Sequence, residues 1–369
     1  MDNKQKLGQF FTTNYKYILQ NMIIPENVVN IIEPFCGSGD LLAFIENQER
    51  YNIESFDIEP KKNYILQRDT IQFPPNYENK FIITNPPYLA RNKSQSKIVF
   101  DKYDVNDLFK CFIKELITNR CIGGIIIVPL NFWSSIRKND ILLRKSFLEI
   151  YDIIQLNIFE ERVFDDTSYT VCSFQFEPKQ NITNEIKITI YPSNVKITTI
   201  LNDGNNYLIG GDIYNLETKN VYKISRLTNK NKTKQNTNIL IKCIDDNINS
   251  KIGLTIVSNE AIYIDETPNQ TARTYATLII EPKIDLDKQK ILADKFNSFL
   301  ESHRIKYNSL FLANYRESKD IARKRISFDL VYRIVEHILD TETYNIMDNN
   351  KQNIENVVNI IKPFVVGIY

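Results

Sequence analysis

The chain of 369 residues has only two histidines, His303 and His337, which lie far apart in the sequence. Neither is near a nucleophile-elbow pattern, and the sequence contains no H-E-x-x-H motif and no cluster of cysteine and histidine. These absences argue against a zinc site and against hydrolysis by a histidine-based triad. We therefore expect no metal at the functional site.

Cysteine is also scarce, with five scattered residues and no C-x-x-C pair. An odd number of scattered thiols does not form a disulfide framework, so reduced cysteines in a cytosol-like compartment are expected. No apolar run approaches the ~20 residues of a membrane helix, and the first six residues lack the apolar core of a signal peptide. We expect an unexported cytoplasmic protein with no membrane partner, or one in the host-cell cytoplasm or nucleus if the source is viral.

A charge excess is absent too, because 46 basic and 45 acidic residues give a net charge of +1. Affinity for a polyanion must therefore come from local patches. Seven basic residues and no acidic one lie between Lys219 and Lys242, and a second cluster, Arg316 with 323–325, precedes an amphipathic helix expected from Ile326. Each is either a solvated surface or a surface that contacts phosphates. Residues 91–97 are expected to form a mobile loop that orders on phosphates.

The first half of the chain alternates strand-like and helix-like segments, which is typical of an α/β sheet with crossover helices. The residue pattern predicts strands over 28–32, 53–58, 81–84, 124–128, 153–158 and 170–176, and helices over 40–49 and 107–117. After Phe176 the texture changes to alternating β segments such as 186–190, and the polar stretch 177–181 is a candidate boundary. We therefore expect a catalytic domain over 1–178 and a second domain over 179–369.

The first expected strand leads into a glycine turn, Glu33–Gly39, with the sequence E-P-F-C-G-S-G. Two glycines one residue apart let the backbone approach a ligand where a Cβ would clash. Asp57 ends the next strand, where a carboxylate either accepts both ribose hydroxyls of a nucleoside cofactor or merely ends the strand. The lack of a third glycine disfavours a dinucleotide.

The third expected strand leads into Asn85-Pro86-Pro87-Tyr88, the N-P-P-Y turn. If the substrate is an exocyclic or amide nitrogen, the Asn85 side-chain oxygen and the Pro86 carbonyl would accept its two hydrogens and localise its lone pair. Successive prolines fix φ and hold that carbonyl in place, and Tyr88 offers an aromatic face for a planar substrate. Asn-Pro-Pro is also a good turn, but its place after a strand favours the chemical role.

In their order, these segments resemble the motifs of the amino-group DNA methyltransferases that use S-adenosylmethionine, in the gamma class of adenine-N6 enzymes. The resemblance covers about residues 7–176, and its specificity lies in order and spacing. It implies a Rossmann-like methyltransferase mixed sheet followed by a C-terminal α+β target-recognition domain. The implied activity is methylation of adenine N6 on a flipped base. The implied partners are double-stranded DNA and, in a restriction-modification rather than viral context, a cognate restriction endonuclease; a monomer is expected.

The resemblance also assigns roles to individual residues. It places the N-terminal motif Leu7–Thr12 at the methionine end of the cofactor, although Thr13 stands where many relatives have proline. The implied cofactor-binding residues are Thr12, Glu33, Phe35, Gly37, Gly39, Asp57 at the ribose, Ile58, Asp69 at the adenine amine, and Phe112 near the adenine. The implied catalytic residues are Asn85, Pro86, Pro87, Tyr88 and Phe164, whose ring packs on the flipped base.

Two alternatives stay open. N-P-P-Y methyltransferases that act on a protein glutamine or on structured RNA share the same chemistry. A catalytically silent DNA-binding module is the other, and the intact glycine turn and N-P-P-Y turn argue against it. A separate oddity is that Glu26–Phe35 recurs as Glu355–Phe364 with nine of ten positions identical. The second copy lacks the two-glycine turn, and chance or partial duplication in a biased chain accounts for it.

The proposed role of Asn85 yields a direct prediction. Asn85→Ala should nearly abolish methyl transfer, because it removes one acceptor for the substrate nitrogen, whereas cofactor binding should survive. Losing Tyr88 should weaken activity without abolishing it, because aromatic stacking returns only ~1–3 kcal/mol per base. Turnover of Asn85→Ala close to that of the wild type, with cofactor binding measured in parallel, would contradict the mechanism.

Overall fold

The computed structural model describes residues 8–164, 169–232, 236–245, 251–266, 274–317 and 322–341. Contacts divide the chain into two compact units. The first contains the described residues as far as Gly211, together with those of Ser309–Lys324. The second contains the described residues from Asp212 to Asn308 and from Arg325 onward.

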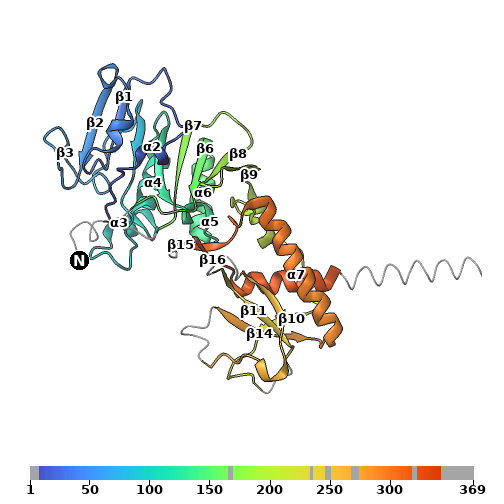
Figure 1. Cartoon of the computed structure of the whole chain (residues 1–369). Helices are drawn as coiled ribbons and strands as arrows, with labels where there is room; N and C mark the ends of the chain where they lie inside the picture. Colours follow the sequence, from blue (N-terminus) through green and yellow to red (C-terminus); the bar gives the residue numbers. More distant parts are fainter. Residues whose placement is uncertain are drawn as a thin grey trace, which may run out of the picture. The chain divides into compact units, whose positions relative to one another are not determined.

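The first unit is built on one nine-stranded mixed sheet in the order β3-β2-β1-β4-β5-β7-β6-β8-β9 (Figure 1). Strands β1 to β5 are parallel where they pair, whereas β7 runs antiparallel to β5 and β6. This arrangement confirms the predicted Rossmann-like mixed sheet. The strands are β1 (Asn30–Glu33), β2 (Asn52–Asp57), β3 (Leu66–Gln67), β4 (Phe81–Thr84), β5 (Gly124–Pro129), β6 (Tyr151–Phe159), β7 (Val171–Pro178), β8 (Glu185–Tyr191) and β9 (Val195–Ile200).

Strands β4 and β5 lie at the centre of the sheet and are buried at every residue. Their near-continuous apolar sequences suit a parallel strand that is covered on both faces. The helices of this unit are α2 (Tyr15–Ile18), α3 (Ile98–Tyr103), α4 (Leu108–Thr118), α5 (Asn131–Ser134) and α6 (Lys138–Leu148), with short 3-10 turns η1 (Leu41–Phe44), η2 (Gln48–Arg50) and η3 (Asp203–Asn205). Helix α4 confirms the helix predicted over 107–117.

The helix predicted over 40–49 is wrong. Two 3-10 turns, η1 and η2, take its place after the glycine turn. The backbone becomes extended at Ile45, with φ −81° and ψ 105°, and Asn47 adopts the left-handed conformation at φ 50°. An α-helix cannot continue through either residue. The glycine turn therefore does not lead into the N-terminus of an α-helix.

The strand order reverses between β1 and β4, because the chain adds β2 and β3 on one side and β4 and β5 on the other. Such a switch point leaves a crevice beyond the carboxyl ends of the two central strands, where ligands bind in open α/β sheets. The glycine turn follows β1 and the N-P-P-Y turn follows β4. The fold thus brings the two motifs together at the place where a ligand is expected.

The predicted domain boundary at 178/179 lies inside the first unit. Strand β8 pairs in parallel with β6, and β9 pairs with β8, so the sheet continues through Ile200. The segment after β9 is then held by Arg144 of α6, whose side chain is fully buried. Its guanidinium donates to the carbonyl oxygens of Tyr207 (2.8 Å), Asn206 (3.2 Å), Phe132 (2.8 Å) and Ser135 (2.8 Å).

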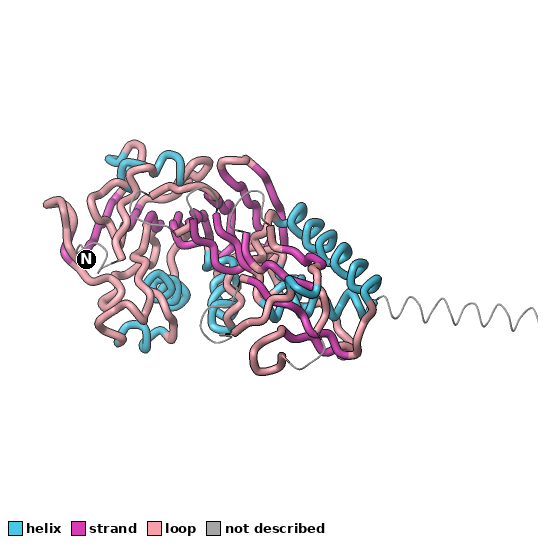
Figure 2. Tube along the Cα trace, turned by 60° about the horizontal axis from the view of Figure 1, so that its bottom comes forward, coloured by secondary structure: helices cyan, strands magenta, loops and turns pink. Residues whose placement is uncertain are grey.

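The second unit contains an antiparallel sheet in the order β10-β14-β11-β13 and a long helix, α7, that packs on β13 (Figure 2). Its α+β character agrees with the prediction. The amide of Asn297 on α7 joins the two elements, because it accepts from Leu254 N and donates to Leu254 O, both at 2.9 Å. The elements are η4 (Gly211–Asn215), β10 (Lys223–Arg226), β11 (Ile239–Lys242), β12 (Ile244–Asp245), β13 (Gly253–Ile256), η5 (Asn259–Ala261), β14 (Tyr275–Glu281) and α7 (Leu286–Tyr307).

The end of the described chain returns through β15 (Ala313–Glu317) and β16 (Ala322–Arg325). The amphipathic helix expected after Arg325 is present over residues 328–341. The second copy of the ten-residue repeat, Glu355–Phe364, lies outside the described residues, whereas the first copy runs into β1 and the glycine turn. Within the described part of the chain, none of the helices has the length and apolar character needed to cross a membrane.

Arg144 supplies a test of why the first unit extends beyond residue 178. Arg144→Met should lower the free energy of unfolding by at least about 2 kcal/mol, because each buried carbonyl left unpaired costs ~1–3 kcal/mol. Trp133, the single tryptophan, is 1% exposed in α5, so its fluorescence during urea unfolding reports on this unit.

The adjacent Lys145→Ala is the matched control. Lys145 binds Asp203 in the same segment at 2.9 Å, but both side chains are solvent-accessible, so its loss should change the urea midpoint little. An Arg144→Met variant as stable as Lys145→Ala would show that the guanidinium is not what holds the segment.

Candidate active site

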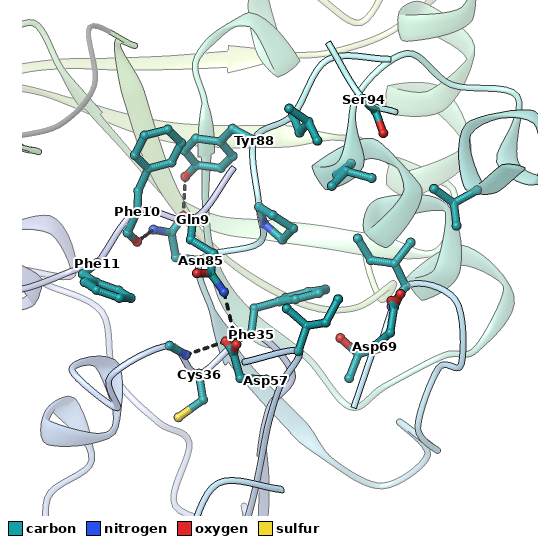
Figure 3. A pocket seen from close by; sticks show the side chains of 18 of the residues that line it. Gln9, Phe10, Phe11, Phe35, Cys36, Asp57, Asp69, Asn85, Tyr88 and Ser94 are labelled. Atoms are coloured by element: carbon teal, nitrogen blue, oxygen red, sulfur yellow. Dashed lines mark hydrogen bonds between the residues drawn. The ribbon is translucent and has the colours of Figure 1, made fainter. Parts of the chain in front are cut away.

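A cavity of about 1010 Å³ opens at the switch point of the first unit (Figure 3). Most of its lining comes from four chain segments: residues 9–12, the glycine turn with the residues after it, the end of β2 and the residues after β3, and the N-P-P-Y turn with the loop after it. The volume is at the upper end of the range for small-molecule sites. Nine of the predicted site residues line it: Thr12, Phe35, Gly37, Asp57, Ile58, Asp69, Asn85, Pro87 and Tyr88.

Asp57 is the point at which three of these segments meet. Its carboxylate accepts hydrogen bonds from Gly37 N at 2.7 Å, Gln9 Nε2 at 3.1 Å and Glu59 N at 2.8 Å. A carboxylate has about four acceptor positions, so three are filled by the protein. A ribose hydroxyl at Asp57 would therefore use the remaining position on Oδ2 or displace the Gln9 amide, which is the only side-chain donor of the three.

The two glycines of the glycine turn have different tasks. Gly37 lies in the left-handed region at φ 55° and lines the cavity. Gly39, at φ 83°, does not line it; a Cβ there would lie 2.6 Å from the hydroxyl oxygen of Tyr64. The first glycine thus brings the backbone to the ligand site, and the second lets the turn close.

Asp69 and Phe35 form the side of the cavity where the resemblance places an adenine ring. Asp69 Oδ1 accepts from the backbone amides of Ile71 and Gln72, at 3.2 and 3.0 Å, which leaves Oδ2 for a ligand amine. Phe112 is 1% exposed and does not line the cavity. Its ring supports Phe35 edge-on at 5.1 Å, so its predicted closeness to the adenine is indirect at best.

The Asn85 side chain has one enforced orientation. Its amide nitrogen lies 2.9 Å from the carbonyl oxygen of Phe10 and 3.1 Å from Thr12 Oγ1. A carbonyl oxygen can only accept, so the nitrogen must face Phe10 and the side-chain oxygen must face the other way. There Oδ1 accepts a hydrogen bond from the Tyr88 hydroxyl, and one of its two lone pairs remains for a substrate.

Tyr88 has a role that the sequence did not indicate. Its ring is only 4% exposed, and its hydroxyl lies inside the protein near Asn85 Oδ1 and 3.1 Å from the Ile127 carbonyl oxygen. Burial raises the pKa of this hydroxyl well above its ordinary value, and Cys172 and Asp107 add to the shift. The hydroxyl therefore stays protonated and can donate to Asn85. Tyr88 thus positions Asn85 as well as lining the cavity.

Three further predicted residues lie near the cavity without lining it: Glu33, Pro86 and Phe164. Glu33 is 1% exposed, and its carboxyl accepts from Thr84 Oγ1 at 2.8 Å while Oε2 has no hydrogen-bond partner. Burial raises the pKa of Glu33 well above its ordinary value, with Asp57 and Asp40 adding to the effect and Thr84 opposing it. Glu33 thus supports the turn from below the cavity surface.

The structure adds residues to the site that sequence reasoning did not select. Gln9 and Phe10 lie in the N-terminal motif, in which the sequence analysis assigns a cofactor role to Thr12 alone, and Asp40 directly follows the glycine turn. The sequence could have indicated these three residues, since each lies in or next to a recognised motif. Tyr169 also lines the cavity, just before β7, and no sequence pattern marked it.

The cavity is rich in carboxylates. Asp40, Asp57 and Asp69 line it, and the basic lining residues are Arg68 and Lys93. The Arg68 guanidinium donates to the carbonyl oxygens of Phe73 (2.7 Å) and Pro74 (2.9 Å), so it is held by the protein itself. Such a lining favours a ligand with positive charge over one rich in phosphate.

Cys36 also lines the cavity, but it is not a reactive thiol. Burial raises the pKa of Cys36 far above the ordinary value, and the nearby carboxyl groups of Glu33 and Asp57 add to the shift. A thiol that stays protonated is a poor nucleophile. All five cysteines are buried and free of disulfides.

The loop after the N-P-P-Y turn is internally bonded. Lys97 Nζ donates to the carbonyl oxygens of Arg91 and Ser94, and Arg91 pairs with Asp101 at 2.6 Å. Lys93 lines the cavity and forms no ion pair with any described residue. Of the three cations proposed to contact phosphates, Lys93 is the one that the described structure leaves available. The mobility of the loop stays a prediction.

In the basic segments of the second half, too, some side chains are exposed and others are bound to protein groups. Lys223, Lys230 and Lys232 are exposed, whereas Arg226 pairs with Asp265 at 3.2 Å and its guanidinium lies 4.8 Å from the centre of the Phe328 ring. Lys234 and the side chains of Arg316 and Arg323 lie outside the described residues. In the first unit, Lys324 binds Glu160 at 2.7 Å. A phosphate-contacting role stays a prediction for Lys223, Lys230 and Lys232.

No protein-family model matches the sequence, and no curated protein matches it either. Several solved structures are similar to it. The type I restriction-modification methyltransferase subunit from Streptococcus thermophilus is 16% identical over 54% of this chain and 52% of its own, with a TM-score of 0.39. The EcoKI M protein, of a type I restriction enzyme, is 13% identical over 49% and 48%, with a TM-score of 0.36.

The type IIG restriction endonuclease BpuSI is 13% identical over 60% of this chain and 36% of its own, with a TM-score of 0.35. The chain thus spans about half the length of the two methyltransferase subunits and about a third of the endonuclease. Identities and scores at this level do not establish membership of a family.

Asp107 gives the stability of the folded protein a measurable pH dependence. It precedes α4, and its Oδ1 is buried without a hydrogen-bond partner. Burial raises the pKa of Asp107 to about 7, against opposing effects of Lys110 and the backbone amides nearby. The folded protein therefore binds this proton more tightly than the unfolded chain does. Its contribution to stability is complete at low pH and is lost as the pH rises through about 7.

We expect Asp107→Asn to gain stability relative to the wild type as the pH rises from 5 to 8, by more than about 1 kcal/mol, since one pKa unit is worth about 1.4 kcal/mol. Urea unfolding of both proteins at the two pH values measures this difference. Glu78→Gln, which removes an exposed carboxylate of the same unit, is the control. An equal difference at both pH values would mean that the Asp107 pKa is not raised.

Proposed function

We propose that this chain is an S-adenosylmethionine-dependent DNA methyltransferase that transfers a methyl group to N6 of an adenine flipped out of double-stranded DNA. The observation that carries the proposal is the enforced orientation of Asn85. Its nitrogen is committed to Phe10 O and Thr12 Oγ1, so its oxygen is presented as a hydrogen-bond acceptor at the cavity. An acceptor of this kind suits a substrate that has N–H groups.

The cavity lining fits the cofactor. Asp57 and Asp69 would bind the ribose and the adenine amine, Phe35 and Ile58 would flank the adenine ring, and Gly37 allows close approach. When bound, S-adenosylmethionine supplies a methyl group attached to a positively charged sulfur. The three carboxylates of the cavity favour that charge. The 3-10 turn after the glycine turn provides no α-helix N-terminus for a pyrophosphate, which disfavours a dinucleotide.

The chain's own residues act mainly by placement. Asn85 Oδ1 has a lone pair free to accept one N6 hydrogen, and the Pro86 carbonyl is the second proposed acceptor. Together they would draw the amine lone pair out of conjugation with the ring and toward the methyl donor. The Tyr88 hydroxyl holds Asn85 in register, and its raised pKa keeps it a donor at every working pH. Holding two reactants in line can supply a large part of the rate enhancement.

No covalent intermediate is required. Cys36 is the only cysteine among the residues that line the cavity, and its raised pKa keeps the thiol protonated. Direct transfer to the nitrogen, with S-adenosylhomocysteine as the leaving group and the extra amine proton released to water, is therefore the simplest chemistry that this site supports. The same acceptor pair would also suit the amide nitrogen of a glutamine or a base in RNA, so the substrate class must come from experiment.

DNA would be bound through phosphate contacts of Lys93 near the cavity and of Lys223, Lys230 and Lys232 in the second unit, which we propose as the target-recognition part. Binding that depends on such contacts weakens steeply as salt concentration rises. A restriction-modification context, with a cognate endonuclease as partner and a monomeric enzyme, belongs to the same proposal.

The test is to incubate the protein with labelled S-adenosylmethionine and unmethylated duplex DNA, and to analyse the nucleosides by mass spectrometry. We expect N6-methyladenine with the wild type and a loss of at least about 100-fold with Asn85→Ala, comparable with the loss of one preorganised hydrogen bond to a reacting group. Binding of S-adenosylhomocysteine by the variant shows that it is folded.

RNA and total protein are incubated in parallel. Label in either of these but not in DNA would keep the cofactor and the chemistry and would overturn the DNA substrate. Transfer to no acceptor, together with failure to bind S-adenosylhomocysteine, would contradict the proposal as a whole and favour a silent binding module.

A further inference from the structure

The Phe10 ring packs near both aromatic residues that are proposed to contact the target base. Its centroid is 5.3 Å from that of Tyr88, with 30° between the planes, and 6.4 Å from that of Phe164, with 43° between the planes. Figure 3 shows the Phe10 ring against Tyr88 at the cavity. We call the space between Tyr88 and Phe164 the target-base slot, because these are the two aromatic residues proposed to contact the flipped adenine. Phe10 places a planar ring next to both residues.

The segment that carries Phe10 is bound to the N-P-P-Y turn at three points. Gly8 O accepts from Tyr88 N at 2.9 Å, and Phe10 O and Thr12 Oγ1 accept from Asn85 Nδ2 at 2.9 and 3.1 Å. Gly8 lies at φ 69°, and a Cβ there would be 2.7 Å from Tyr88 O. The segment is therefore packed directly onto the catalytic turn, and the position of the Phe10 ring is part of that packing.

The residue next to Phe10 contacts the proposed cofactor site. Gln9 Nε2 donates to Asp57 Oδ1 at 3.1 Å, on the carboxylate assigned to the ribose hydroxyls. A ribose hydroxyl is also a hydrogen-bond donor, so Gln9 satisfies Asp57 in the way that the cofactor would. Two adjacent residues of one segment thus contact the two proposed ligand sites. Gln9 binds the carboxylate proposed to hold the ribose, and Phe10 packs at the proposed site of the target base.

We propose that the side chains of Gln9 and Phe10 close the active site in the absence of ligands. The cofactor, by displacing Gln9 from Asp57, frees the Phe10 ring to leave the target-base slot, while Phe10 O and Thr12 Oγ1 continue to hold the Asn85 amide. This inference rests on the proposed function. It assigns to Phe10 the role of a positioning residue that fills the slot with an aromatic ring until the base replaces it.

The arrangement has a thermodynamic consequence. Both ligands require the adjacent side chains of Gln9 and Phe10 to move, so the ligand that binds first bears the cost of moving them and the second binds more tightly. Coupling between two binding sites is reciprocal and typically amounts to a factor of about 5–150 in affinity. DNA should therefore tighten cofactor binding by the same factor by which the cofactor tightens DNA binding.

Titration calorimetry with S-adenosylhomocysteine measures this coupling. The Kd is determined without DNA and with a saturating duplex that the wild-type protein methylates, whose site is first found by sequencing methylated product. We expect the duplex to lower the Kd of the wild type at least about fivefold, at the low end of typical coupling. The coupling ratio is the Kd without duplex divided by the Kd with duplex. In Phe10→Ala this ratio should fall to within twofold of one, because the base can then enter the slot without displacing an aromatic ring.

Three further variants sharpen the result. Phe73→Ala removes a phenylalanine that is 61% exposed and does not line the cavity, and it should keep the wild-type ratio. Phe10→Leu retains apolar volume and guards against misfolding; it should give a reduced ratio. Gln9→Ala leaves Asp57 free, so it should bind S-adenosylhomocysteine at least as tightly as the wild type and also show a reduced ratio.

If both Phe10 variants showed the same coupling ratio as the wild type, the inference would be overturned and the proposed function would stay intact. Lost methylation with unchanged coupling in Phe10→Ala would also overturn it, because Phe10 would then be a fixed wall of the slot. A wild-type protein that methylates DNA but shows no coupling has the same meaning. Absence of both methylation and S-adenosylhomocysteine binding in the wild type would instead contradict the proposed function, and the inference with it.

Discussion

The Asp57 carboxylate is the interaction on which the organisation of the site depends. It accepts hydrogen bonds from the glycine turn, through Gly37 N, from the N-terminal segment, through Gln9, and from its own strand end, through Glu59 N. Three separate stretches of the chain are thereby fixed around the Asp57 carboxylate. Because the carboxylate is 4% exposed, these donors take the place of water. The same charge makes the crevice suitable for a nucleoside with hydroxyl donors and a positive sulfur.

Asn85 depends on the same N-terminal segment. The carbonyl of Phe10 and the hydroxyl of Thr12 take both hydrogens of its amide, and the Tyr88 hydroxyl donates to its oxygen. One five-residue segment therefore contacts Asp57, the proposed ribose acceptor, through Gln9, the proposed base site through Phe10, and the Asn85 amide through Phe10 O and Thr12. This shared dependence is why binding of the cofactor and admission of the base are expected to be coupled in this protein.

Part of this structure was predictable from sequence because its signals are local. Strand β4 has the predicted bounds Phe81–Thr84, and α4 begins one residue after the predicted start, since apolar periodicity marks it. The helix over 40–49 failed because the backbone leaves the helical region at Ile45 and again at Asn47, which intrinsic helix propensity does not determine. The boundary at 178/179 failed because β8 joins β6 through long-range pairing. The positioning role of Tyr88 could not be read either, since burial of its hydroxyl is a tertiary property.

The central claim is that the crevice between β1 and β4 binds the nucleoside cofactor and presents it to Asn85. Ultraviolet cross-linking of the wild-type protein with S-adenosylmethionine labelled in its methyl group, followed by mapping of the labelled peptides, tests it most directly. The account predicts label within residues 33–40, 57–71 or 85–90, and its loss when unlabelled S-adenosylhomocysteine competes. The account would be contradicted if the label that S-adenosylhomocysteine displaces were confined to the second unit, or to β8 and β9 at the far edge of the sheet.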